Sequence, residues 1–142
     1  MRQRIELIAD SYRRLLDQPL CVSDGNIAAS LWNAAAVILA HGTEVDPLVF
    51  FANRVALDAF EIGLDDIIGM PSRLTAEPVH RDERAALLNR VTMHGFIRDY
   101  AGIRISATGR RFRIGQAIVW NLIDAAGTCH GQAATFARWT EV

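Results

Sequence analysis

Three polar residues in a short turn-rich segment have side chains suited to metal binding or acid–base chemistry. His41, Glu44 and Asp46 lie within HGTEVDP, residues 41–47. Imidazole and carboxylate groups suit divalent ions, and His41 with Asp46 would also serve as an acid–base pair. A metal site needs a fourth ligand at a suitable spacing, and this segment offers none. We therefore favour a solvated loop over either chemistry.

The sequence indicates no other enzyme chemistry. All 15 basic residues are arginine, which excludes a phosphate-loop lysine and a Schiff-base lysine. The motifs GxSxG, CxxC and HExxH and a glycine-rich phosphate loop are absent. The carboxylate pairs Asp65–Asp66 and Asp82–Glu83 are typical of helix starts. We predict that the chain is not an enzyme.

A glutamine interrupts an apolar row in RFRIGQAIVWNL, residues 111–122. The even positions on either side of Gln116 are Phe112, Ile114, Ile118, Trp120 and Leu122. On a strand this row would face a core, and a buried amide left unpaired costs roughly 1–3 kcal/mol. We predict that Gln116 points into a pocket and bonds Thr135 across the sheet, a backbone group or a trapped water; a polar ligand is the alternative.

Two further side chains are candidates for ligand binding. Arg73, in PSRLTAEP, has the bidentate geometry to clamp a carboxylate or phosphate, although an ion pair with Glu77 is the simpler expectation. His94 ends a predicted helix, where its favoured role is to interact with the helix dipole.

The first half of the chain predicts helices around two strands. Apolar residues recur at helical spacing from Ile5 until Pro19, and a second short helix is expected after Ser23 or Asp24. Strands are expected at residues 36–41 and 48–53. Asn53 then caps a helix that ends just before Gly63, and a longer helix covers residues 80–94 and stops at Gly95.

From residue 99 onward the hydrophobic period falls to two, which predicts strands at 99–107, 111–123 and 128–139. We place Ile103 and Ile105 on the core face with Phe112 and Ile114. Trp120 is placed on the same face as Ala133. The opposite face is predicted to carry Tyr100, Arg104, Arg113, Asn121, His130, Phe136 and Arg138. Its arginines need an acidic cover, for which we name Glu6, Asp10 or Asp17, or a second subunit.

These elements predict an α+β fold: a five-stranded antiparallel sheet with helices on one face, preceded by an N-terminal amphipathic helix. We divide the chain into a helical extension, residues 1–33, and a domain, residues 34–142. The net charge of −1 argues against direct binding of nucleic acid or anionic lipid. The longest apolar run is too short to span a bilayer and no signal peptide is recognisable, so we expect a cytoplasmic protein.

Several blocks resemble known families. The stretch FFANRVALDAFEIGLDDIIGMP resembles the strand-to-helix opening of a PAS domain. More closely, HGTEVDPLVFFANRVALDAFE, PSRLTAEPV, GFIRDYAGIRIS and GRRFRIGQAIVWNLI resemble the MEKHLA domain, a PAS-related family, over nearly the whole chain. The six-residue opening that gives the family its name is absent, and Gly115 replaces a glutamate that often precedes the glutamine. The resemblance implies a PAS-like fold and a sensory or regulatory role, with no established ligand.

The resemblance also bears on cofactors. Some PAS domains hold haem iron near the position of His94, but a histidine at a helix end is more often a dipole partner. Light-sensing flavin domains carry a reactive cysteine after the second strand, where this chain has MPSRLTAEP. Covalent flavin photochemistry is thereby excluded, non-covalent flavin stays open, and the cofactor is left unknown.

Three functional hypotheses follow. The first is a PAS-like sensor without its own output module that binds a small, mostly apolar molecule through Gln116, Trp120, His94 and Arg73. The second is a ligand-free interaction module, a homodimer formed through Tyr12 of the N-terminal helix and the arginines of the outer sheet face, Arg104, Arg113 and Arg138. The third is a small enzyme that uses His41 and Asp46.

Overall fold

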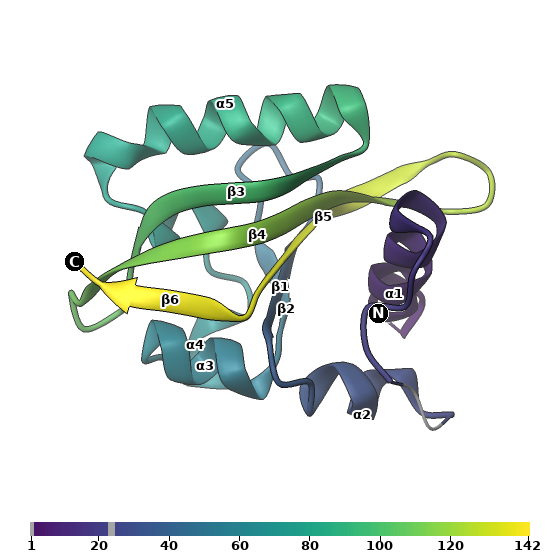
Figure 1. Ribbon diagram of the computed structural model, residues 1–142, viewed down its shortest axis with the longest axis horizontal. Helices are drawn as coiled ribbons and strands as arrows, with labels where there is room; N and C mark the ends of the chain where they lie inside the picture. The colour runs from purple at the N-terminus through teal and green to yellow at the C-terminus, as the bar shows by residue number, and fades with distance from the viewer. Residues whose placement is uncertain (1, 23–24) are drawn as a thin grey trace.

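A computed structural model describes residues 2–22 and 25–142, in which five α-helices, a short 3-10 helix and six strands follow one another. The first half contains α1 (Arg2–Leu16), α2 (Ile27–Trp32), β1 (Val37–His41), β2 (Val49–Ala52), α3 (Arg54–Phe60) and α4 (Leu64–Ile67). The second half contains η1 (Ser72–Thr75), α5 (Pro78–His94), β3 (Phe96–Ile105), β4 (Arg111–Ile123), β5 (Cys129–Phe136) and β6 (Arg138–Glu141). In Figure 1 the sheet crosses the molecule beneath α5.

The sheet is antiparallel, with the strand order β2-β1-β5-β4-β3, and β6 also pairs with β4. Only Ala137 separates β5 from β6, so these two strands form one bent ribbon alongside β4. The predicted five-stranded α+β architecture is confirmed, with the expected third C-terminal strand divided in two. Every neighbouring pair is antiparallel, and the elements alternate little between strand and helix, as this fold class requires.

A β-bulge at Gly115 and Gln116 reverses the two faces of β4. Between the pairs Tyr100↔Ala117 and Gly102↔Ile114, β4 advances three residues while β3 advances two. Gln116 takes a left-handed backbone conformation, with φ 52°, and its side chain is exposed. Even-numbered residues of β4 face one side of the sheet before the bulge, and odd-numbered residues face that side after it.

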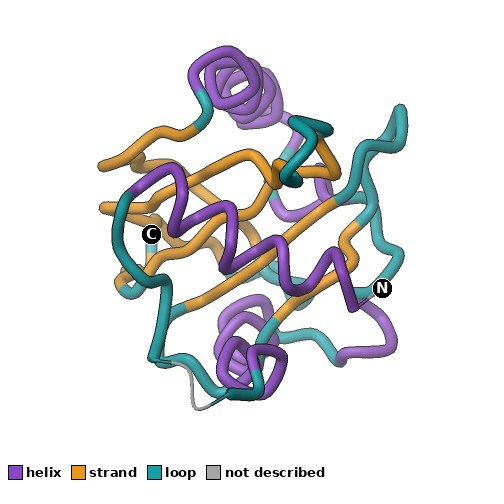
Figure 2. The backbone as a smooth tube through the Cα atoms, turned by 90° about the vertical axis from the view of Figure 1, so that its right-hand side faces the viewer, coloured by secondary structure: helices purple, strands orange, loops and turns teal. Residues whose placement is uncertain are grey.

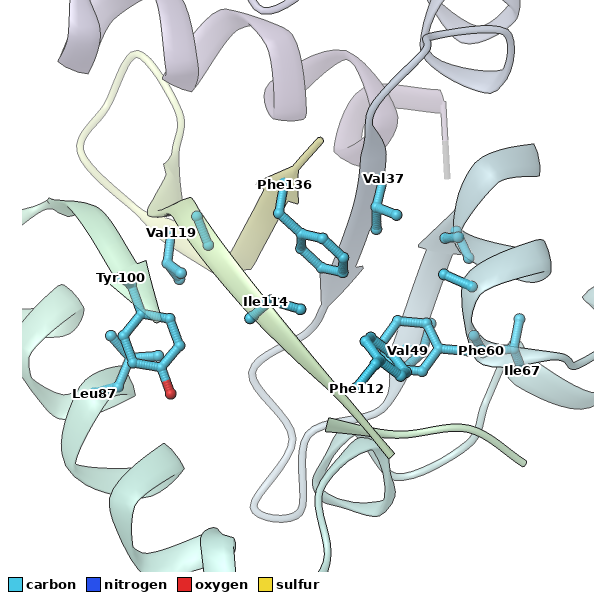
Figure 3. Packing of buried hydrophobic residues seen from close by; sticks show 14 of the residues in the cluster. Val37, Val49, Phe60, Ile67, Leu87, Tyr100, Phe112, Ile114, Val119 and Phe136 are labelled. Carbon is cyan, nitrogen blue, oxygen red and sulfur yellow. The ribbon is translucent and has the colours of Figure 1, made fainter. Parts of the chain in front are cut away.

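As a result, the chain has one hydrophobic cluster on each face of the sheet. The inner cluster lies between the sheet and α3, α4 and α5, and Figure 3 shows its side chains, among them Phe112, Ile114 and Val119. The outer cluster lies between the sheet and α1, and it includes Trp120 and Leu122. Figure 2 shows α1 crossing the sheet on the side away from α5. The expectation that helices cover only one face was therefore incomplete.

The docking of α1 rests on specific polar contacts as well as burial. The Trp120 indole N–H donates to the Ile8 carbonyl at 3.1 Å, and the Ser11 hydroxyl and the Ile123 backbone exchange hydrogen bonds at 2.9 and 3.1 Å. The ring of Tyr12 meets that of Trp120 edge-on, with 4.9 Å between centroids. The division at residue 34 stays a prediction, and this cluster joins residues from both sides of it.

Most predicted helix boundaries agree with the structure, and their caps explain them. The Asn53 side chain accepts a hydrogen bond from the Ala56 N–H. Gly95, with φ 91°, donates its N–H to the Val91 carbonyl. Two details were wrong. The helix α3 ends earlier than predicted, at Phe60 with the left-handed Glu61 as its C-cap, and Gly63 is the N-cap of α4. Asn26 caps α2, and the proposed caps Ser23 and Asp24 lie outside the described residues.

The register predicted for β3 was also wrong. Because Gly102 pairs with Ile114 and Arg104 with Phe112, these residues share the inner face. Ile103 and Ile105 instead pair with Arg113 and Arg111. Trp120 pairs with Ala133, so the two residues share a face as predicted, but this face is the outer one that α1 covers. The pairing from Gly102 to Ile105 is regular, and both register shifts of β3 lie before Gly102, so the error of one residue arose at the turn between β3 and β4.

Asn53 makes four side-chain hydrogen bonds and gives a stability test. Its fully buried amide accepts the Ile38 and Ala56 N–H groups and donates to the Leu31 and Ala36 carbonyls, at 2.8–3.1 Å. Asn53→Ala leaves these groups unpaired, so we expect the free energy of unfolding to fall by at least about 3 kcal/mol in urea denaturation.

The matched control is Asn89→Ala, at an exposed position of α5. Its expected change is within about 0.5 kcal/mol. Similar losses for the two variants would contradict the role given to Asn53.

Candidate functional site

A cavity of about 50 Å³ lies between the inner face of the sheet, α5 and η1. This volume admits a few water molecules or a solute of roughly four to seven non-hydrogen atoms. The sheet contributes Leu39, Ala40, His41, Val49, Tyr100, Arg104, Ile114, Val119, Gln132, Ala133, Ala134 and Phe136, and the helices contribute Phe60, Ser72, Thr75, Arg84, Leu87 and Leu88. Figure 3 shows Leu87 and Tyr100 meeting beside Ile114 and Val119.

His41 brings a polar atom without a partner to this cavity. Its Nδ1 lies 3.1 Å from the Gly42 carbonyl, which only accepts, so Nδ1 carries the proton and Nε2 is an acceptor. Nε2 is buried and has no hydrogen-bond partner in the described chain. Burial, reinforced by the charge of Arg84, lowers the pKa of His41 to about 4 despite the opposing Gly42 bond. The imidazole is therefore neutral at pH 7.

Two arginines line the same cavity from opposite elements. Arg104 of β3 is 7% exposed and donates to the Ile103 carbonyl at 2.8 Å and the Tyr100 hydroxyl at 3.2 Å. Arg84 of α5 donates to the Ser72 hydroxyl at 3.0 Å. Burial, and secondly the nearby charge of Arg104, lowers the pKa of Arg84 to about 10, so Arg84 is still a cation at neutral pH.

Gln116 was predicted to be buried, but the buried amide that joins α5 to the sheet belongs to Gln132. Its Nε2 lies 3.1 Å from the Leu88 carbonyl, the Thr92 hydroxyl and the Asn121 side-chain oxygen. Asn121 in turn donates to the Val91 carbonyl at 3.0 Å. These bonds hold the C-terminal half of α5 at a fixed distance from β4 and β5, and that spacing sets the depth of the cavity.

The structure corrects three of the four predicted ligand contacts outright. Gln116 is exposed at the bulge, so the predicted bond to Thr135 does not form, because Thr135 pairs with Ile118. Trp120 is fully buried, but beneath α1 on the outer face, since the bulge turned it away from the cavity. His94 is exposed at the end of α5 and does not line the cavity.

The fourth predicted contact, Arg73, also lies outside the cavity lining. Its side chain is about half exposed and pairs with Asp46 at 3.2 Å. The predicted alternative partner, Glu77, is instead held by Arg111 in a two-bond contact. Arg73 therefore ties η1 to the β1–β2 loop.

The predicted interface residues divide into two groups. Tyr12 is 5% exposed because it packs on Trp120 within the chain, and Arg104 faces the cavity, so neither lies on an outer surface. The inferred acidic cover for Arg104 was therefore wrong. Arg113 and Arg138 are exposed on the outer face, where Arg113 pairs with Thr140 and Gly115 with Arg138.

The loop residues that suggested chemistry do not meet. Asp46 is engaged with Arg73, Glu44 accepts the Leu48 N–H at 3.0 Å, and His41 turns to the cavity. Over residues 2–22 and 25–142 no cluster of three or more His, Cys, Asp or Glu side chains is arranged to hold a metal ion. Within the same ranges, no helix has the length and apolar character needed to cross a membrane.

Comparison with known proteins now identifies the family. The MEKHLA domain model matches residues 2–141. The chain belongs to the MEKHLA domain family. Homeobox-leucine zipper protein ATHB-9 of Arabidopsis thaliana is 27% identical over 128 residues, which are 89% of this chain and 15% of that protein. REVOLUTA of the same plant is 27% identical over 151 residues, 95% of this chain and 17% of that protein. The chain thus spans about a sixth of these relatives.

Solved structures show that this MEKHLA domain has a PAS-like fold. A PAS domain from Colwellia psychrerythraea superposes with a TM-score of 0.66 at 11% identity, covering 81% of this chain and 92% of that one. A LOV protein of Rhodobacter sphaeroides gives 0.65 at 10% identity, covering 100% and 68%. At these identities the likeness concerns the fold alone.

The residues around the cavity do not fit the flavin that a LOV domain binds. Pockets for ligands of drug or cofactor size measure about 300–1,000 Å³, whereas this cavity measures about 50 Å³. The side chains of Tyr100, Arg84 and Arg104 line this cavity between α5 and the sheet. Both cysteines of the described chain, Cys21 and Cys129, lie outside the cavity lining. We assign no flavin to this domain.

The polar residues Arg84, Arg104 and Gln132 were not predicted from the sequence to line the cavity. Arg104 was placed on the wrong face because the predicted register of β3 against β4 was wrong by one residue. Arg84 lies one turn before Leu87 on the inner side of α5, and its spacing from that buried leucine and from Val91 was the available signal.

His41 predicts a distinct pH dependence of stability. Its pKa is about 4 in the folded chain and 6.5 when free, so the unfolded chain binds the proton more readily. The stability that neutral His41 contributes is complete above pH 6.5, and about 3 kcal/mol is lost as the pH falls to 4. We expect His41→Gln to flatten the plot of unfolding free energy against pH in this window.

The control is His94→Gln, at an exposed histidine, which should keep the wild-type slope. Carboxylates with lowered pKa values, such as Glu61 and Glu77, act mainly below pH 4.5. An unchanged slope in His41→Gln would mean that His41 is not held neutral by burial.

Proposed function

We propose that this MEKHLA domain is a sensory domain that binds a small molecule in the cavity between α5 and the sheet. The observation that carries the proposal is the buried, unpaired Nε2 of His41, a residue that lines a largely apolar cavity together with Arg84, Arg104 and Gln132. Such polar atoms in native structures call for a partner. The family and its PAS-like fold support a sensory role.

A route for signalling follows from the alternation of β4. Val119 lines the cavity, and the next residue, Trp120, bonds the Ile8 carbonyl of α1 on the other face. A ligand that presses on Val119 would change the position of Trp120, and hence the docking of α1. We propose that ligand occupancy shifts the population of docked α1 and that a partner protein reads this change. The domain itself needs no enzymatic activity for this role.

Filling the cavity tests the proposal. Ala134 is half-buried, pairs with both Leu39 and Val119, and lines the cavity. Ala134→Leu should occupy the space with three added carbons. The test is a thermal-shift measurement on the whole chain with a panel of alcohols, amides, amines and carboxylates of about four to seven non-hydrogen atoms. We expect a compound that binds to stabilise the wild type by about 2.7 kcal/mol at 100 times its Kd. The variant should not be stabilised.

Ala137→Leu makes the same substitution at an exposed position between β5 and β6 and should respond as the wild type does. Sensing in this cavity is refuted when no compound of the panel stabilises the wild type, or when Ala134→Leu responds equally well.

A second candidate function, homodimerisation, is favoured by Arg113 and Arg138. Both are exposed on the sheet's outer face, beyond the part that α1 covers, and neither forms an ion pair within residues 2–22 and 25–142. We propose that acidic groups of a second copy meet these arginines.

Charge reversal tests this second function. Arg113→Glu should shift the chain from dimer to monomer in sedimentation velocity, with at least a tenfold weaker dimer constant (about 1.4 kcal/mol). The control Arg90→Glu reverses an exposed arginine on α5 and should leave sedimentation unchanged. Equal sedimentation of all three proteins would exclude Arg113 from any dimer contact.

A further inference from the structure

Two cations face the cavity without a countercharge in the described chain. Arg104 donates to a backbone carbonyl and to the Tyr100 hydroxyl, and Arg84 donates to the Ser72 hydroxyl. Each guanidinium has five N–H donors, so most of them are not used by these bonds. No ion pair of the described residues includes Arg84 or Arg104.

The neighbouring carboxylates form no ion pair with either arginine, although Glu83 shares the Tyr100 hydroxyl with Arg104. Glu83 accepts the Tyr100 hydroxyl through both oxygens at 2.8 Å, from an exposed position on α5. Asp46 pairs with Arg73, and Glu44 accepts the Leu48 N–H. A buried charge without a partner costs several kcal/mol, so an anion that entered the cavity would recover much of that cost.

The rest of the cavity adds two requirements. The Nε2 of His41 needs a hydrogen-bond donor. His41 also lies near enough to Arg84 for the charge of that arginine to lower the pKa of the imidazole. The remaining wall is hydrocarbon, formed mainly by Leu39, Leu87, Ile114, Val119 and Phe136. A matching ligand therefore has a negative group, a donor close to it and a short apolar part.

We propose that the ligand is a short-chain hydroxycarboxylate. Its carboxylate lies between the guanidinium groups of Arg84 and Arg104, its hydroxyl donates to Nε2 of His41, and its hydrocarbon packs on the apolar wall. This identification rests on the proposed function of the cavity as a small-molecule site. The volume of about 50 Å³ limits the chain to a few carbons.

Calorimetric titration of the whole chain with four probes tests the chemistry of each part. Lactate carries all three features, propanoate lacks the hydroxyl, propane-1,2-diol lacks the charge, and inorganic phosphate lacks the hydrocarbon. We expect lactate to bind most tightly, propanoate and phosphate to bind at least about tenfold more weakly, and the diol to give no measurable binding.

Variants assign the contacts to residues. Arg84→Met and Arg104→Met should each weaken lactate binding at least about tenfold, and His41→Phe should reduce lactate to the level of propanoate. Arg90→Met, at an exposed arginine of α5, is the control and should bind lactate normally. Arg84→Gln removes the charge but can still donate to Ser72, so it gives the same loss of binding with less disturbance of the fold.

The ligand-free proteins supply a second readout. Removing a buried cation that lacks a countercharge should leave the melting temperature of Arg104→Met equal to or above that of the wild type. A lower melting temperature, together with normal lactate binding in Arg84→Gln, would overturn the proposal.

The two proposals can fail separately. If the diol binds as tightly as lactate and Ala134→Leu abolishes both, the cavity is a ligand site but its ligand is not an anion. If lactate binds equally to wild type, Ala134→Leu and Arg84→Gln, it binds elsewhere and both proposals fall.

Discussion

The bulge at Gly115 and Gln116 is the constraint on which the architecture of this MEKHLA domain depends. A continuous strand of 13 residues would place all its even-numbered side chains on one face. One extra residue sends Phe112 and Ile114 to the inner cluster and Trp120 and Leu122 to the outer one. Without it, either α1 or the inner helices would meet a sheet face of the wrong polarity. The break between β5 and β6 lies beside the same point, where Ile118 pairs with Thr135 and Gly115 with Arg138.

The bulge also explains how much of the structure the sequence could predict. Local signals were sufficient for the elements: Asn53 and Gly95 bound their helices where propensity and capping place them. The family resemblance supplied the topology. The predicted faces of β4 were wrong because an alternation with a period of two does not show where an extra residue shifts it. The glycine inside the strand, with apolar residues at both parities after it, was the available sign of a bulge in a strand covered on both sides.

The candidate site was harder to predict than the fold for a related reason. Gln116 drew attention because an isolated polar residue in an apolar row is conspicuous. The buried amide at the helix–sheet contact is Gln132, whose partners belong to α5, 40 and 44 residues away in sequence. Similarly, Arg104 stands in a strand of mixed polarity, where nothing in its neighbours distinguishes a buried arginine from an exposed one. Only the register of β3 against β4, in which Arg104 pairs with Phe112, turns it inward.

The energetics of the cavity suit a switch better than a rigid core. A well-packed hydrophobic interior would be more stable than one that holds buried Arg104, half-buried Arg84 and an unpaired imidazole nitrogen. Under the proposed function, a molecule bound in the cavity would supply part of the folding free energy, and stability would be linked to occupancy. Because Val119 and Trp120 are consecutive in β4 and face opposite layers, the same strand carries the cavity wall and the anchor of α1. A change of about 1–3 kcal/mol on one face, the usual scale of coupling between sites, is comparable to the few hydrogen bonds that hold α1 on the other.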